Sequence, residues 1–111
     1  MKTAHDPRHQ QRIAIVQQLF AYSFHEDITP LIEPIVPHLP EIDARIAAVA
    51  TQRPLDQMNK LDLAILREAV FELVYKNQER NIMLDEAIEI ARLLGSETSA
   101  KFMNAVLSKI V

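Results

Sequence analysis

Residues 61–75 constrain the fold of this chain most, because only four of these fifteen residues are charged. On a helix, at about 100° per residue, the large apolar side chains fall on two faces. The faces are Leu66, Ala69 and Leu73 on one side, and Leu63, Val70, Phe71 and Val74 on the other. A helix with two apolar faces needs several neighbours to cover it, so this stretch predicts the central helix of a bundle. Arg67 falls within the second apolar arc, which is unusual because arginine is almost never fully buried without a partner.

Composition favours an all-α fold for the 111-residue chain. A single glycine argues against a β-rich protein with many tight turns, and the abundant Ala, Leu, Ile, Glu and Gln favour helix. At 49% hydrophobic residues, the chain can build one core. We therefore expect a single domain over residues 1–111, a compact bundle of five to six helices.

Prolines and capping residues predict the boundaries in the first half of the chain. Asp6 followed by Pro7 predicts a helix start, and this helix should continue to Phe24. Its expected core stripe, spaced by three or four residues, is Ile13, Val16, Phe20 and Phe24. Four prolines then interrupt residues 25–40, so we expect an abbreviated, proline-broken connection made of short turns. A helix over residues 40–51 follows.

The second half should hold two helices after the central one. Polar residues 77–81 predict a loop. We expect the next helix to start with Asp85 as its N-cap and to stop at Gly95. Ser96 should start the last helix, whose apolar stripe comprises Met103, Val106, Leu107 and Ile110.

Positive charge is concentrated in one segment only. Residues 1–12 form a basic N-terminal edge, with Lys2, Arg8 and Arg12 against the single acid Asp6. The net charge of the chain is −3, which is not typical of a strong, independent nucleic-acid binder. Any nucleic-acid contact would therefore be local, or shared with a basic partner.

Catalysis and cofactor binding find little support in the sequence. The chain lacks cysteine and any glycine-rich phosphate loop. His5 and His9 could share a helix face, but a third metal ligand is missing, and the acids Asp85, Glu86 and Glu89 are typical of a helix start. We expect no enzyme, no cofactor and no metal site. With no apolar run that suits a signal peptide or a membrane span, we expect a cytoplasmic protein without membrane contact.

Two charged groups leave alternatives open. Arg67, near Glu68 and Glu72, either pairs with an acid and fixes how helices meet, or contacts a ligand directly; the structural role is favoured. Phe102 lies at the rim of the last apolar stripe beside Lys101. It is either an outer core residue or a stacking platform for a base, with the lysine meeting phosphate.

Several motifs resemble the NusB family of bacterial transcription antitermination factors. Residues 64–73 (AILREAVFEL) resemble the family signature "ailRlavyEL", and residues 85–92 (DEAIEIAR) resemble its "nEAvelAk" helix. Gly95 and residues 99–107 (SAKFMNAVL) are similar to its "fG…s.kFvNgvLd" ending, and residues 12–22 to its basic first helix. The motifs occur in the family's order and cover about three-quarters of the chain, so together they are specific.

The resemblance implies an all-α bundle that pairs with ribosomal protein S10 and binds boxA RNA within the RNA polymerase antitermination complex, without a small-molecule substrate. It implies RNA contacts at Lys2, Arg8, Arg12, Lys101 and Phe102. It also implies an S10 contact at Asp62, and a structural signature at Arg67, Glu72 and Asn104, in which Arg67 and Glu72 form a pair.

The chain departs from the family pattern in its first half. The family usually carries two further helices before the segment resembling residues 41–49, and here that region is reduced to residues 25–40. Ala105 also replaces a family glycine. Two alternatives to the antitermination role follow. One is a protein-interaction module that has lost RNA binding, and the other is the NusB-like accessory domain of a ribosomal RNA methyltransferase.

Overall fold

The computed structural model describes residues 6–110. They form α1 (Pro7–His25), η1 (Val36–His38), α2 (Leu39–Val49), η2 (Leu55–Gln57), α3 (Lys60–Tyr75), α4 (Arg80–Leu94) and α5 (Glu97–Leu107). This part of the chain contains no strand, which confirms the all-α bundle. None of the helices within residues 6–110 is long and apolar enough to cross a lipid bilayer.

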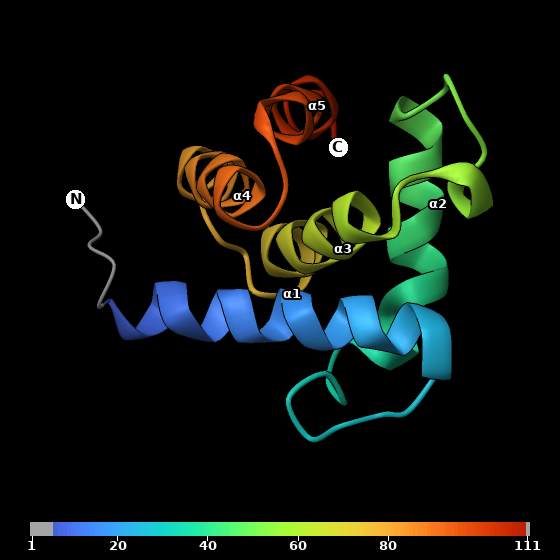
Figure 1. Cartoon of the computed structure of the whole chain (residues 1–111), viewed down its shortest axis with the longest axis vertical. Helices are drawn as coiled ribbons and strands as arrows, with labels where there is room; N and C mark the ends of the chain where they lie inside the picture. The colour runs from blue at the N-terminus through green and yellow to red at the C-terminus, as the bar shows by residue number, and fades with distance from the viewer. Residues whose placement is uncertain (1–5, 111) are drawn as a thin grey trace.

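Helix α3 is the centre of the bundle, as its sequence predicts. It packs against each of the other four α-helices, which surround it in Figure 1. Leu63, Leu66, Ala69 and Val70 are buried, so both apolar faces of α3 are covered. Its apolar side chains are half-buried only at the two ends of the helix, at Leu61 and at Leu73, Val74 and Tyr75.

Side-chain caps start three of the helices. The Asp6 carboxylate accepts the backbone N–H of Arg8 (2.9 Å) at the start of α1, and Ser96 Oγ accepts the N–H of Ser99 (3.2 Å) at the start of α5. Both predicted starts are confirmed. The Asn59 side chain caps α3 in the same way.

Helix α4 begins six residues earlier than expected, with Glu79 at its N-cap, so the prediction of Asp85 as its N-cap is wrong. Met83 lies four residues before Ala87 and extends the buried face of the helix upstream. Arg80, in the first turn, donates from Nη1 to the carbonyl oxygen of Leu107 (2.8 Å) and so ties α4 to the end of α5. The polar loop is therefore only four residues long, 76–79.

Gly95 ends α4, as predicted. It does so without a left-handed backbone, since its φ is −118°. A glycine is needed because a Cβ atom here would lie 2.9 Å from the carbonyl oxygen of Ala91 and 3.0 Å from Ser99 Oγ. The tight approach lets α5 turn back directly against α4.

Residues 26–35 cross from α1 to η1 in short turns, as the prolines predict. Glu26 adopts a left-handed conformation (φ 57°) that ends α1. The Thr29 hydroxyl donates to the Gln18 side chain, which fastens the connection to α1. Ile32 and Ile35 are buried and join the core.

Candidate nucleic-acid interface

Arg12 lies inside the bundle, which corrects its assignment as an RNA contact. Its Nε and Nη2 donate to the two carboxylate oxygens of Glu72 at 2.8 and 3.0 Å. Its Nη1 lies 3.2 Å from Glu86 Oε1, and the residue is only 7% exposed. Arg12 shares a helix face with buried Val16 and Leu19, so it joins α1 to α3 and α4 instead of presenting a charge to phosphate.

The ion pairs of Arg12 belong to a larger buried network. The Nδ1–H of His9 donates to Glu86 Oε2 (2.7 Å), so Glu86 holds two residues of α1. Glu68 lies beside Glu72, and within residues 6–110 no group donates to either of its oxygens. Burial, reinforced by the neighbouring Glu72 carboxylate, raises the pKa of Glu68 well above its ordinary value. Burial and the neighbouring carboxylate thus both disfavour the ionised form of Glu68.

The pKa of Glu72 is shifted in the opposite direction. Burial tends to raise its pKa, but the hydrogen bonds from Glu68 and Arg12 outweigh burial and lower it. Sequence reasoning missed Glu68, Glu86 and His9 as members of this network. The available signal was the presence of two glutamates four residues apart within the most apolar helix of the chain.

The prediction that Arg67 and Glu72 form a structural pair is wrong, because the Glu72 carboxylate binds Arg12. Arg67 instead binds Asp43 of α2 through two hydrogen bonds. Its expected role, pairing with an acid and joining helices, is therefore confirmed with a different partner. Asn104, the third member of the predicted signature, is exposed on α5.

The remaining RNA candidates lie in two places. Lys2 falls outside the described residues. Arg8 is exposed in the first turn of α1, and its Nη2 lies 3.4 Å from the Asp6 carboxylate. Figure 1 shows the N-terminal end of α1 on the side of the bundle where α4 lies. Lys101 is exposed and Phe102 is half-buried on α5, which confirms that Phe102 lies at the rim of the stripe.

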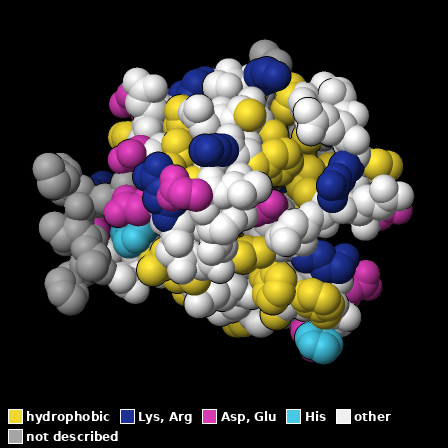
Figure 2. Space-filling view, turned by 45° about the horizontal axis from the view of Figure 1, so that its top comes forward, with side chains coloured by type: hydrophobic (Ala, Val, Ile, Leu, Met, Phe, Trp, Pro, Cys, Tyr) yellow, Lys and Arg dark blue, Asp and Glu magenta, His cyan; other side chains and the backbone are white. Residues whose placement is uncertain are grey.

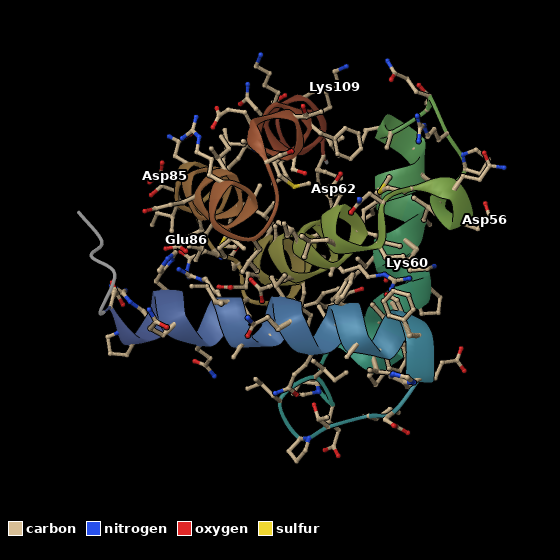
Figure 3. The ribbon with its side chains drawn as sticks, in the orientation of Figure 1. Asp56, Lys60, Asp62, Asp85, Glu86 and Lys109 are labelled. Atoms are coloured by element: carbon tan, nitrogen blue, oxygen red, sulfur yellow. The ribbon has the colours of Figure 1, made fainter. Side chains whose placement is uncertain are left out.

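A groove of about 430 Å³ lies beside Phe102. It runs between α5, the start of α3 and the segment that links α2 to α3. Its lining comprises Val49, Ala50, Thr51, Gln52, Arg53, Met58, Asn59, Asp62, Thr98, Phe102, Ala105, Val106 and Lys109. Figure 3 shows Asp62 at the start of α3 below α5, and Lys109 at the end of α5.

Among the described residues that line this groove, Asp62 is the only acid. Its Oδ1 is buried and has no hydrogen-bond partner in the part of the chain that the structure describes. Burial raises the pKa of Asp62, and a hydrogen bond with Ser99 offsets part of this effect. The groove thus combines apolar walls, two cations and one incompletely satisfied carboxylate.

An aromatic patch, defined here as Phe20, Phe24 and Ile28, is exposed at the C-terminal end of α1. The two phenylalanine rings meet edge to face at 5.1 Å, and Lys60 Nζ lies 5.8 Å from the centre of the Phe24 ring. The prediction that Phe20 and Phe24 belong to the core stripe is wrong, because α1 buries the face that carries Val16 and Leu19. Figure 2 shows hydrophobic side chains gathered between Lys and Arg side chains on the face that includes α5.

Comparison with known proteins defines the class of this fold. The structure matches a solved structure of T. maritima NusB with a TM-score of 0.82 and 29% sequence identity, over 98% of this chain and 91% of that chain. The bundle is therefore a NusB-type helical fold. The NusB family model matches residues 23–111, and the chain belongs to the NusB family.

Curated relatives agree with this family. The transcription antitermination protein NusB of Geobacter sp. (strain M21) is 40% identical over 91 residues, which is 81% of this chain and 61% of the relative. That of Pseudothermotoga lettingae is 40% identical over 85 residues, 76% of this chain and 61% of the relative. The chain thus spans about 61% of the length of these relatives.

Proposed function

We propose that this protein is a non-enzymatic transcription antitermination factor of the cytoplasm. It binds boxA-type RNA together with ribosomal protein S10 in the RNA polymerase antitermination complex. The observation that carries the proposal is the exposed Lys101 beside half-buried Phe102 on α5, within a motif of the NusB family. A cation next to an aromatic rim is suited to phosphate and base contacts.

The RNA contact needs help from a partner. The net charge is −3 and Arg12 is buried. Arg8 forms an ion pair with Asp6, which partly neutralises its charge. Phosphate contacts supply most of the affinity of such complexes, so few free cations mean weak binding by the chain alone. A basic partner such as ribosomal protein S10 would complete the phosphate-binding surface.

The aromatic patch supports the partner contact. Phe20, Phe24 and Ile28 expose apolar surface next to Lys60. Asp62 lies about 200° further around α3 and lines the groove beside α5. Exposed aromatic residues with charges at their edge are typical of protein–protein interfaces. We assign ribosomal protein S10 to this surface and propose Asp62, on the groove side of α3, as a second contact.

The test measures fluorescence anisotropy of a labelled boxA RNA with and without ribosomal protein S10. We expect tight binding only with both proteins present. Lys101→Gln should weaken RNA binding several-fold, whereas Lys76→Gln, an exposed lysine at the end of α3, should not. Absence of RNA binding even with ribosomal protein S10 would reject the RNA half of the proposal.

The partner half is tested separately by calorimetry with ribosomal protein S10 alone. Phe24→Ser should weaken this binding, and the matched control Leu93→Ser, a similarly exposed apolar residue on α4, should leave it unchanged. Equal effects of both variants would reject the aromatic patch as the docking surface.

A protein-interaction module without RNA binding is the second candidate. The burial of Arg12 favours it, because this removes one of the few cations of the basic edge. Binding of ribosomal protein S10 that never creates an RNA-binding complex would support this candidate over the first.

A further inference from the structure

The first two turns of α1 are held to the bundle by ionisable side chains. Within residues 7–12, the buried side chains are His9 and Arg12, and the buried apolar residues of α1 begin only at Val16. Figure 3 shows Glu86, which binds both His9 and Arg12, between α4 and the first turns of α1. The attachment of this segment therefore depends on charge, whereas the rest of α1 is anchored by apolar burial.

The cluster around these two side chains contains more acids than bases. Glu68 and Glu72 come from α3 and Glu86 comes from α4. The hydrogen bond to Glu72 raises the pKa of Arg12 against the effect of burial, and the charges of all three glutamates add to the rise. If all three carboxyl groups ionise, the buried negative charges outnumber the buried positive ones even when His9 is protonated. Such an imbalance is costly in a buried interface.

Glu68 is the member of the cluster that can relieve this imbalance. Its oxygens receive no hydrogen bond from the part of the chain that the structure describes. Burial, reinforced by Glu72, raises the pKa of Glu68, and the charges of Arg12 and of the exposed Lys76 oppose this rise only in part. Water would reach this carboxyl group if the first turns of α1 moved away, and it would then ionise more readily.

We propose that residues 7–12 form a proton-dependent latch, which stays helical and packed while Glu68 is neutral and unwinds when Glu68 ionises. The turns of α1 that bury Val16 and Leu19 remain in place when the latch opens. Opening brings Arg12 into solvent and displaces Arg8, an exposed cation of the basic edge. The latch operates in the free protein, so it does not rest on the proposed RNA binding.

The direction of the pH dependence follows from proton binding. The closed latch holds one proton more than the open latch at pH values between about 4.5, the ordinary pKa of glutamate, and the raised pKa of Glu68. Within this range the ratio of closed to open molecules falls about tenfold for each pH unit, and above the range it is constant. The pKa of Glu72 is lowered, so its own contribution changes only below about pH 4.5.

Hydrogen exchange of backbone amides, followed by NMR between about pH 5 and pH 8, measures opening of the latch. The amides of residues 10–12 lose their helical hydrogen bonds when residues 7–12 unwind, whereas the amide of Leu19 keeps its own. Protection factors, which correct for the intrinsic pH dependence of exchange, should fall about tenfold per pH unit at residues 10–12 and stay constant at Leu19. An equal fall at Leu19, or no fall at residues 10–12, overturns the latch.

Glu68→Gln tests whether Glu68 carries the proton. The amide keeps the shape of the side chain and cannot ionise, so the slope of the fall at residues 10–12 should decrease by about tenfold per pH unit. The matched control is Glu33→Gln, an exposed acid in the connection after α1, which should leave the slope unchanged. A slope that persists in full in Glu68→Gln assigns the proton to another group, such as His9, and overturns the proposal.

A measurement on the unmodified protein does not depend on the folding of any variant. The NMR signal of the Glu68 side-chain carboxyl carbon reports its titration directly. The midpoint of this titration should coincide with the pH at which protection of residues 10–12 stops falling. A Glu68 carboxyl group that is already ionised at about pH 5, while residues 10–12 are still protected, overturns the latch.

Discussion

Arg67 of α3 and Asp43 of α2 are joined by two parallel hydrogen bonds, from Nε to Oδ1 at 2.9 Å and from Nη2 to Oδ2 at 2.8 Å. Both side chains are largely shielded from solvent. A two-point bond between planar groups fixes orientation as well as distance. Since α2 continues into one wall of the groove at Val49 and Ala50, this ion pair also holds that wall against α3.

Asp43→Ala should destabilise the fold by about 1.5–3 kcal/mol, because it removes hydrogen bonds to a charged group and leaves Arg67 without its partner. Urea denaturation measures the change. Asp56→Ala, an exposed acid in η2, should change stability by no more than about 0.5 kcal/mol. Equal effects at the two positions would contradict the structural role of the pair.

Arg12→Leu should cost about 3–5 kcal/mol in the free energy of unfolding, because it leaves the buried carboxylates Glu72 and Glu86 without their cation. The control is Arg92→Leu, whose ion pair with Glu97 at 2.8 Å is mostly exposed. Such surface pairs contribute about 1 kcal/mol or less. A cost for Arg12→Leu as small as that of the control would mean that the ion pairs of Arg12 contribute little to holding α1.

Glu68 should make stability depend on pH. Its pKa is raised in the folded state, so its stabilising contribution is complete below the unfolded value of about 4.5 and is lost as the pH rises through the folded value. Glu68→Gln keeps the shape and cannot lose a proton. The stability of the variant relative to the unmodified protein should therefore increase as the pH is raised.

The measurement for Glu68 is urea denaturation of both proteins at a series of pH values from 4.5 upward. The difference between them isolates Glu68 from Arg12, Glu72 and Lys76, which face the same network in both proteins. A difference that stays constant over this range would show that Glu68 is ionised in the folded state.

Leu66→Ala should cost about 2–5 kcal/mol, the range for truncation of a buried leucine, because Leu66 is completely buried in the central helix. Leu93→Ala is the matched control, since Leu93 is 61% exposed on α4. Chemical denaturation of both variants gives the comparison. A cost below about 1 kcal/mol for Leu66→Ala would contradict the central position of α3.

The sequence predicts the bundle and its centre well, for a physical reason. Helical periodicity and caps are local properties, so Asp6, Gly95 and Ser96 mark helix ends without knowledge of the tertiary structure. The start of α4 is missed because Met83 continues the apolar face into a stretch that looks polar on average.

The site is predicted less well, because charge on its own does not say which way a side chain points. Arg12 appears in a basic segment but turns inward to Glu72, sixty residues away in the sequence. Phe20 and Phe24 have the spacing of core residues, yet α1 turns a different face to the core, so Leu19 is buried and the two phenylalanines are exposed. Both errors concern long-range pairing, which periodicity within one helix cannot supply.

Glu86 contacts α1 at two residues on one face, His9 and Arg12, three positions apart. A slide of α1 by one helical turn would break both contacts at once, so this carboxylate sets the register of α1 against α4. The register is thus fixed by side chains within the core and not by the connection that follows α1. The connection over residues 26–35 can therefore become shorter or longer in evolution while α1 keeps its position against α4. The entropic cost of closing a loop rises only slowly with the length of the loop.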